Sequence, residues 1–261
     1  MKKKFVAFSF LFLLFGQWSW AQLFNTKNRM DNLEGFDEQK FSWGFYLVGN
    51  NFDYKIVLHP KYGMDGNKNA VVSKTSPSFG AGLIGRMRIN DNFDLRIEPA
   101  LQFVERELQF STFQAVNNNY DFTKWPIENQ IQEPTDADKV RNVKSTYIDI
   151  PVLLEYHGNR WYNSRPYAAA GVNWMTNLQA NENAVDDNQL GMFRTLSNNF
   201  AWSVEMGMQF YFMRFKLTAG VRGTFMFNNE LVGDNEGTPP YWAGAINQLN
   251  TRAYMLVLKF E

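Results

Sequence analysis

The sequence contains no cysteine among its 261 residues, so the protein forms no disulfide bond and uses no thiolate chemistry. It has only two histidines, His59 and His157, and no cluster of metal-ligand type. Lysine plus arginine equals aspartate plus glutamate at 26 each, with no long basic block after the N-terminus, which argues against a nucleic-acid partner. We therefore predict no cofactor and no metal site.

Long hydrophobic runs are also missing beyond the N-terminus. No later segment offers 18 consecutive apolar residues, so we expect no transmembrane helix. At the start, Lys2–Lys4 precede an apolar run from Phe5 to Phe15, and Ser19 and Ala21 put small residues at positions −3 and −1. This pattern predicts a signal peptide over residues 1–21, since an uncleaved anchor would need about 17 apolar residues or more.

What the sequence does contain is long stretches in which apolar and other residues alternate with a period of two. In Ser78–Phe110 the apolar positions recur at every second residue through two long arms, which are joined by Asn90-Asp91-Asn92. This period predicts strands. Each arm keeps the pattern for roughly 10 residues, the length with which a tilted strand crosses a bilayer. We therefore expect the apolar stripe to face lipid and the charged stripe to face the inside of a closed barrel.

The same pattern recurs along the chain and predicts eight strands. Residues 22–40 are polar and are expected to form an N-terminal extension in the periplasm, followed by the barrel at 41–261. Within the long alternating stretch 199–228 the apolar stripe changes from even to odd numbers, which predicts a turn near Phe212-Met213-Arg214. The expected strands are 41–50, 78–89, 93–110, 144–156, 166–178, 199–211, 215–228 and 251–261.

The connections between these strands alternate between long and short. An even number of antiparallel strands with long outer loops and short periplasmic turns is the pattern of bacterial outer-membrane proteins. We therefore predict an all-β, eight-stranded, up-and-down transmembrane barrel that is integral to the outer membrane. Its N-terminus is expected in the periplasm and its long loops outside the cell. The last strand, with Phe260 beside the end, has the form of an outer-membrane sorting signal.

The stripe opposite the lipid-facing one is rich in both signs of charge. Six cations and five anions are expected to point inward: Arg86, Arg88, Arg96, Lys216, Arg222, Lys259, Asp94, Glu98, Asp149, Glu155 and Glu205. An eight-stranded barrel has an interior that side chains just fill, and unpaired charges there would be costly. We therefore predict a paired network that closes the lumen, with a narrow proton or ion path as the alternative.

Two motifs suggest chemistry and are set aside. Gly80–Gly85 matches the GxGxxG pattern, but a nucleotide site needs a following helix, and here the alternation continues as strand. His59 with Ser73 or Ser76 could form a hydrolytic group, although nothing in their spacing enforces it. We therefore predict no catalytic, cofactor-binding or metal-binding residues, and a protein that is not an enzyme.

Four blocks of the sequence resemble conserved segments of the PorT family, in the same order and spacing. They are Ile89–Phe110 (INDNFDLRIEPALQFVERELQF), Ser145–Tyr156 (STYIDIPVLLEY), Arg165–Trp174 (RPYAAAGVNW) and Phe210–Asn229 (FYFMRFKLTAGVRGTFMFNN). The resemblance extends over most of the chain after residue 42. One departure is Thr218-Ala219, where the family usually has Ser-Pro.

The resemblance implies an accessory component of type IX protein secretion, with a role in gliding motility in some bacteria, and it supplies no catalytic or ligand-binding residues. An eight-stranded barrel is too narrow to pass a folded protein, so we expect action through contacts with other secretion components and with lipid. Candidate contact surfaces are residues 22–40 and the turn His157–Arg165. The alternatives are a structural or adhesive barrel of the OmpA/OmpX kind and an outer-membrane hydrolase.

Overall fold

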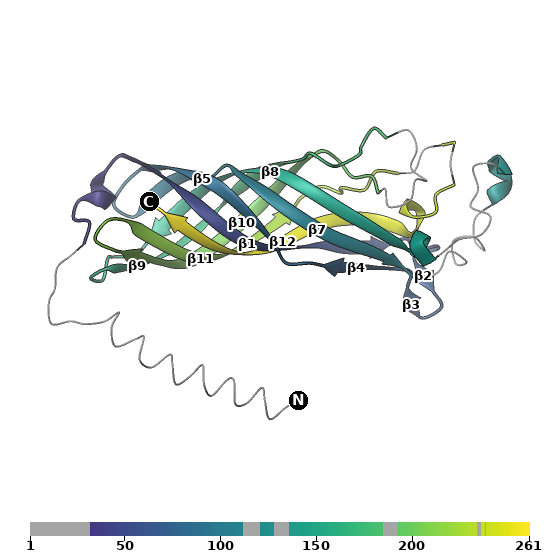
Figure 1. The fold of residues 1–261 in the computed structure, drawn as a ribbon, viewed down its shortest axis with the longest axis horizontal. Coiled ribbons are helices and arrows are strands. Elements are labelled where there is room, and N and C mark those ends of the chain that lie inside the picture. Colours follow the sequence, from purple (N-terminus) through teal and green to yellow (C-terminus); the bar gives the residue numbers. More distant parts are fainter. Residues whose placement is uncertain (1–31, 112–120, 128–135, 185–192, 234–235, 238) are drawn as a thin grey trace, which may run out of the picture. The chain divides into compact units, whose positions relative to one another are not determined.

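Antiparallel strands in the computed structural model pair side by side into one closed ring (Figure 1). The structure describes residues 32–261 except 112–120, 128–135, 185–192, 234–235 and 238; the predicted signal peptide lies outside the described residues. The strands are β1 (Phe41–Leu58), β4 (Val71–Thr75), β5 (Ser78–Arg88), β6 (Phe93–Ile97), β7 (Ala100–Phe110), β8 (Val140–His157), β9 (Ser164–Asn177), β10 (Asn198–Tyr211), β11 (Lys216–Met226) and β12 (Ile246–Phe260).

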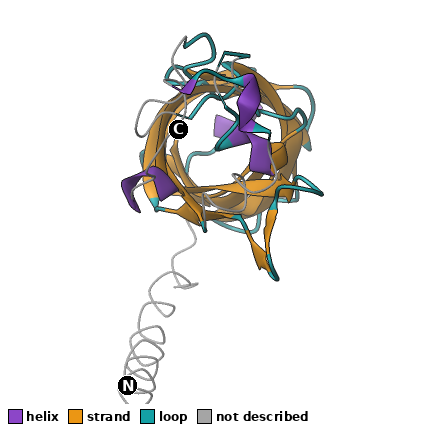
Figure 2. Cartoon of the chain, turned by 90° about the vertical axis from the view of Figure 1, so that its right-hand side faces the viewer, coloured by secondary structure: helices purple, strands orange, loops and turns teal. Residues whose placement is uncertain are grey.

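From β8 to β12 each strand pairs with the next one in sequence, and β8 also pairs with β6 and β7. β1 pairs with both β12 and β5, which closes the ring (Figure 2). Counted around the ring there are eight strand positions, because β4 with β5 and β6 with β7 each occupy one position. The predicted eight-stranded antiparallel barrel is thus confirmed. A separate hairpin, β2 (Met64–Asp65) with β3 (Lys68–Asn69), lies in the connection after β1. None of the helices in the described residues is long and apolar enough to cross a membrane.

The two ends of the ring differ in the length of their connections. We call the end with the turns 89–92, 158–163 and 212–215 the short-turn end, and the opposite end the long-loop end. Figure 1 shows the C-terminus at the short-turn end and the β2–β3 hairpin at the long-loop end. The predicted turn after β10 is confirmed, since the Phe212 N–H donates to the Phe215 carbonyl at 3.0 Å.

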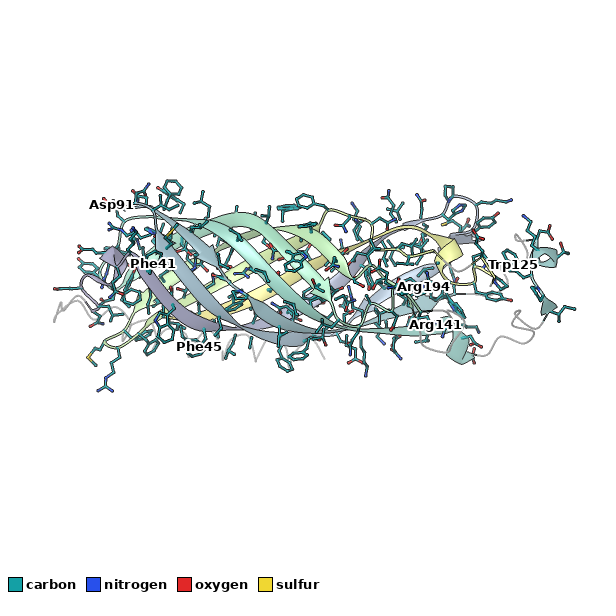
Figure 3. The ribbon with its side chains drawn as sticks, turned by 90° about the horizontal axis from the view of Figure 1, so that it is seen from above. Phe41, Phe45, Asp91, Trp125, Arg141 and Arg194 are labelled. Atoms are coloured by element: carbon teal, nitrogen blue, oxygen red, sulfur yellow. The ribbon has the colours of Figure 1, made fainter. Side chains whose placement is uncertain are left out.

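The outward stripe forms a continuous apolar band around the ring. Along β10 it runs from Phe200 to Phe210, a rise of about 25 Å at a strand tilt of about 45°. Aromatic side chains lie at both edges of the band, as Figure 3 shows for Phe41 and Phe45 near the short-turn end. Exposed members of the band include Phe41, Trp43, Leu47, Phe79, Leu83, Phe103, Trp174, Phe200, Met206, Tyr254 and Leu256.

The third predicted strand is interrupted, which corrects the expectation of one continuous arm over 93–110. It divides into β6 and β7 at Glu98-Pro99. The pairing with β8 keeps the same register on both sides, from Ile97↔Val152 to Ala100↔Asp149, so no residue is inserted. Pro99 and Pro151 both lack an N–H, and both fall in this gap in the ladder. The Glu98 N–H still donates to the Pro151 carbonyl at 3.1 Å.

Five strands, β1, β4, β7, β8 and β12, continue past the apolar band at the long-loop end, and all except β7 correct the predicted bounds of the loops. β1 extends to Leu58 instead of Asn50, β8 begins at Val140, β12 begins at Ile246, and β4 lies in the predicted loop 51–76. Arg141 of β8 is a charged exception in this extension, 0 % exposed with its guanidinium carbon 3.6 Å from the centroid of the Trp242 ring, but most inward side chains here are apolar. They form a second core with loop residues: Tyr54, Ala70, Val71, Leu108, Phe110, Val143, Phe193, Tyr241, Trp242, Ala245, Ile246 and Leu249. Beyond the apolar band, therefore, the apolar positions of the alternating pattern mostly face the interior of the ring instead of the outside.

Candidate functional site: the charged lumen and the segment that covers it

Ten of the eleven charged side chains that the alternation places inward are buried in the ring, between 0 and 2 % exposed. The exception is Arg88, which lies at the rim and pairs with Asp91 of the adjoining turn. Arg88 is the last residue of β5, so no neighbouring strand covers it on the side of the turn. The prediction of a charged interior is confirmed by the remaining ten.

Glu98 and Glu205 are the centre of the network. Lys259 Nζ lies 2.7 Å from Glu98 Oε1 and 2.7 Å from Glu205 Oε1. Arg222 donates from Nε to Glu205 Oε2 at 2.6 Å and pairs with Glu98 through Nη2. Each carboxylate therefore pairs with at least two cations, which offset the hydration that a buried charge has lost.

Arg96 connects this centre to the short-turn end. Its Nε donates to Glu98 Oε1 at 3.0 Å, and its Nη1 lies 3.1 Å from Glu155 Oε2. The third nitrogen, Nη2, lies 3.0 Å from Glu261 Oε2, and Lys216 Nζ reaches the same oxygen at 2.9 Å. Burial alone would raise the pKa of the Glu261 carboxyl, but Arg96 and Lys216 outweigh it and hold that pKa below its ordinary value.

A tyrosine from β9 adds a hydrogen bond to the centre and depends on a glycine of β11. Tyr167 Oη donates to Glu205 Oε1 at 2.6 Å. Its side chain crosses the paired residues Gly207 and Gly220 of β10 and β11, and a Cβ atom on Gly220 would lie 2.2 Å from Tyr167 Oη. Glycine is thus required at Gly220 because the tyrosine occupies the space of a side chain.

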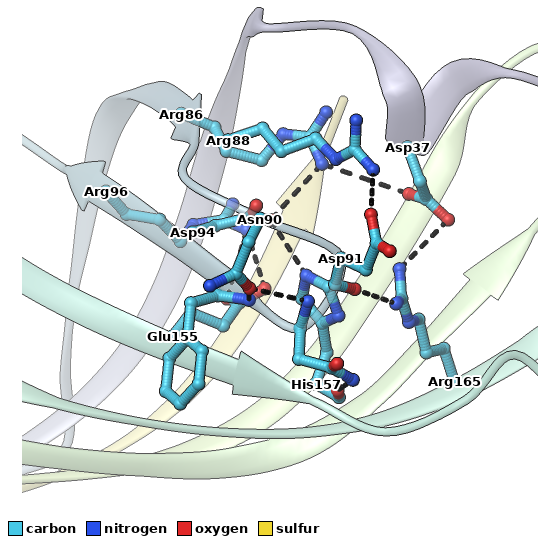
Figure 4. Close-up of polar contacts among 12 residues, drawn as sticks. Asp37, Arg86, Arg88, Asn90, Asp91, Asp94, Arg96, Glu155, His157 and Arg165 are labelled. Carbon is cyan, nitrogen blue, oxygen red and sulfur yellow. Dashed lines mark hydrogen bonds and ion pairs between the residues drawn. The ribbon is translucent and has the colours of Figure 1, made fainter.

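The N-terminal segment, residues 33–40, covers the short-turn end of this network (Figure 4). Asp37 lies 3.2 Å from Arg165 Nη1 and 3.9 Å from Arg86 Nη1, and it accepts a hydrogen bond of 2.7 Å from Tyr211 Oη. Arg86 Nη2 donates to the Phe36 carbonyl at 3.2 Å. The Asp37 carboxylate therefore links the N-terminal segment to three strands, β5, β9 and β10.

The Phe36 ring adds to this cover. Arg86 lies over the ring with its guanidinium carbon 5.5 Å from the centroid, and Lys216 Nζ lies 5.1 Å from it. Both are cation–π contacts. The 3-10 turn Phe36–Glu38 thus presents an aromatic ring and a carboxylate to the cations of the lumen.

His157, which the sequence pattern places in a turn, is part of a strand and is buried. It is the last residue of β8, 3 % exposed, and its Nε2 lies 3.2 Å from Asp94 Oδ2. Asp94 also pairs with Arg86 at 3.2 Å. β8 ends one residue later than predicted, at His157, and the alternation of the strand places this side chain in the lumen.

The described part of the predicted N-terminal contact surface, residues 32–40, meets the other predicted surface, His157–Arg165, at the short-turn end, and residues 22–31 lie outside the described residues. Arg165, which follows the turn 158–163, bonds Asp37 through Nη1, Gly158 O through Nε at 2.7 Å and Asp91 O through Nη2 at 2.9 Å. Arg165, Glu261 and Arg106 lie outside the predicted inward set although each shares the inward phase of its strand, so the alternation could have found them. Nothing in the sequence pattern indicates the place of Asp37.

The two motifs set aside from the sequence are in the places expected. Gly80–Gly85 lies within β5, and a Cβ on Gly80 would lie 2.2 Å from Gln102 Oε1 inside the ring. His59 stacks on Tyr62 and accepts from the N–H groups of Lys61 and Tyr62; no described contact joins it to Ser73 or Ser76. Among the described residues no group of three or more His, Cys, Asp or Glu could hold a metal ion.

The sequence matches the family described as outer membrane protein beta-barrel domain over residues 20–232. The chain belongs to this family. No curated protein matches the chain. The family places the protein in the outer membrane as an integral barrel, so the outward apolar band faces lipid.

Solved structures of outer-membrane proteins are similar at low identity. OprG from Pseudomonas aeruginosa is 10 % identical, with 83 % of this chain and 94 % of that chain covered and a TM-score of 0.41. Neisserial surface protein A is 13 % identical, with 85 % and 98 % covered and a TM-score of 0.36. Ail of Yersinia pestis, in complex with a heparin analogue, is 9 % identical, with 85 % and 99 % covered and a TM-score of 0.35.

Proposed function

We propose that this barrel is a non-enzymatic accessory component of type IX protein secretion, with a role in gliding motility where that occurs. The four PorT-like blocks support the link to secretion. The closed lumen supports a role through surface contacts, because Glu98, Glu205 and their cations fill the interior with mutual ion pairs. A protein substrate cannot pass such an interior, so the barrel acts through contacts with a larger translocon.

The short-turn end is the proposed contact surface. It combines the N-terminal segment, which Asp37 ties to Arg165, with the turn 158–163. Trp161 and Tyr162 at this turn are 66 % and 41 % exposed, with ring centroids 6.0 Å apart. Exposed aromatic pairs on a short turn suit a protein interface, where aromatic residues are enriched.

The proposal includes a topology. Residues 1–21 are a signal peptide, residues 22–40 lie in the periplasm, and the long loops lie outside the cell. The short-turn end then faces the periplasm, where the other components of a secretion apparatus are accessible.

The test is a deletion strain that carries plasmid copies of the gene. Secretion of cargo with C-terminal secretion signals is measured in the culture medium by immunoblot. We expect loss of secretion in the deletion strain, restoration by the natural sequence, and failure of a Trp161→Ala/Tyr162→Ala double variant. Met213→Ala is the matched control, because Met213 is 84 % exposed in another short turn, and it should restore secretion fully. Normal secretion by the deletion strain would refute the proposal.

A structural or adhesive barrel is the second candidate, and the extension of five strands beyond the apolar band favours it. Shortening the connection between β9 and β10, residues 179–196, should abolish adhesion to surfaces if the outer loops carry the function. Under the first proposal, the same change should leave cargo secretion intact. For a hydrolase, His59→Ala would have to abolish function; full complementation by this variant counts against it.

A further inference from the structure

The wall of the barrel has a hollow at the edge of the apolar band nearest the long-loop end. Here a groove of about 380 Å³ opens on the outer surface between β5, β7 and β8. Small-molecule sites commonly have volumes of about 300–1,000 Å³. The residues that the argument uses are Pro77, Phe79, Phe103, Glu105, Lys144 and Thr146.

The hollow follows from a shift in strand register. Toward the long-loop end, β7 pairs with β4, starting at Thr75↔Arg106. Toward the short-turn end, β7 pairs with β5, starting at Gly80↔Gln102. Four residues, 76–79, therefore stand opposite three, 103–105, which is the count of a β-bulge. Pro77 lies in the longer side and cannot donate to a ladder. Residues 103–105 consequently have no ladder partner among β4 and β5, and the wall recedes there.

The groove is apolar at one side and charged at the other. Phe79 and Phe103, 65 % and 41 % exposed, belong to the aromatic edge of the lipid-facing band, with ring centroids 5.1 Å apart. One step further toward the long-loop end, Lys144 Nζ lies 3.5 Å from Glu105 Oε1, and both side chains are more than half exposed. The groove thus spans the boundary between the hydrocarbon region and the headgroups.

We propose that this groove binds one bilayer lipid, with an acyl chain packed against the Phe79–Phe103 ring pair and a phosphate-bearing headgroup at Lys144. The position in the band brings lipid to the site without any partner protein, and the gradient from aromatic to ammonium matches the gradient along a phospholipid. Glu105 holds Lys144 at the rim. The inference rests on membership of the barrel family and is independent of the secretion proposal.

The test uses the full chain, purified in dodecyl maltoside and mixed with phosphatidylglycerol, and counts bound lipids by native mass spectrometry. We expect a population with one retained lipid. Thr146→Trp, which fills the groove, should reduce this population at least fivefold, and Lys144→Glu, which places two carboxylates at the rim, should reduce it about as much. Phe200→Leu is the matched control, because Phe200 is a 62 % exposed aromatic at the same edge of the band but outside the groove.

Folding of each variant is verified by the slower gel mobility of boiled against unboiled samples. Since Lys144 is 68 % exposed, the Lys144→Glu variant should fold even if Thr146→Trp does not. Equal retention of lipid by natural protein and Lys144→Glu, or equal loss in Phe200→Leu, would overturn the proposal. The proposal would also be overturned if the natural protein retained no lipid. That outcome is expected if a side chain of a partner protein occupies the groove.

Discussion

Glu98 shows at the scale of one residue how this lumen tolerates charge. It is fully buried and is paired with Arg96, Arg222 and Lys259. The attraction of three cations offsets the loss of hydration that burial imposes on a carboxylate. Removal of the carboxylate leaves these cations buried, away from water and short of a counter-charge, which is strongly destabilising.

We predict that Glu98→Ala destabilises the barrel by about 3–5 kcal/mol, and that Glu205→Ala has a similar effect, because each leaves Arg222 and Lys259 short of a partner. Urea denaturation in lipid vesicles, followed by tryptophan fluorescence, measures the change. Asp136→Ala is the control: Asp136 pairs with Lys139 at 2.7 Å, but its side chain is 96 % exposed, so the urea midpoint should stay that of the natural chain. Unchanged midpoints for both glutamate variants would contradict the ion-paired lumen.

Glu261 predicts how stability changes with pH. Its pKa is held below the ordinary value by Arg96 and Lys216, so the folded state binds its proton less readily than the unfolded state. The stability that it contributes is therefore present above the unfolded pKa of about 4.3 and is lost as the pH falls below it.

The urea midpoint of the natural chain should fall between pH 5 and pH 3. Glu261→Gln should have a lower midpoint at pH 7 and a smaller fall with acid, because the group that titrates has been replaced. Glu34→Gln, at an exposed position, serves as the control and should follow the natural chain. An identical acid dependence in Glu261→Gln would exclude this carboxyl as a source of it.

At the scale of elements, the strands could be predicted and their irregularities could not. Alternation indicates which side of β5 or β10 faces lipid, because successive side chains point to opposite faces. The bulge at residues 76–79 depends on which residues of β7 stand opposite, and pairing between distant strands is not visible in either strand alone. The break at Glu98-Pro99 is likewise defined by its partners on β8, where Pro151 stands opposite Glu98.

The N-terminal segment is the element whose docking can be tested most directly. Asp37→Asn should weaken its attachment to Arg86, Arg165 and Tyr211, because the amide carries no charge and offers one acceptor oxygen instead of two. We expect faster amide hydrogen exchange across residues 33–40, at least tenfold, with little change in the strands. Glu38→Gln is the adjacent control, since Glu38 is exposed in the same 3-10 turn. Equal exchange in both variants would show that Asp37 does not hold the segment.

At the scale of the whole molecule, the topology proposed for the membrane can be tested because the chain lacks cysteine. A single cysteine introduced at Lys61, in the connection after β1, should react with a membrane-impermeant maleimide on intact cells. A single cysteine introduced at Tyr162, in the turn before β9, should react only after the outer membrane is permeabilised. The natural chain is the unlabelled control, and the reverse pattern would invert the proposed orientation.

The sequence by itself determined the number of crossings, the lipid-facing stripe and ten of the buried charges. Each of these follows from a period of two that is local to a strand. Only the tertiary structure decided which cation shares which carboxylate, where the ladder breaks, how far β1, β8 and β12 extend beyond the band, and that Asp37 covers the short-turn end. These depend on ring closure, which brings residues such as Glu98 and Lys259 together across 161 positions of sequence.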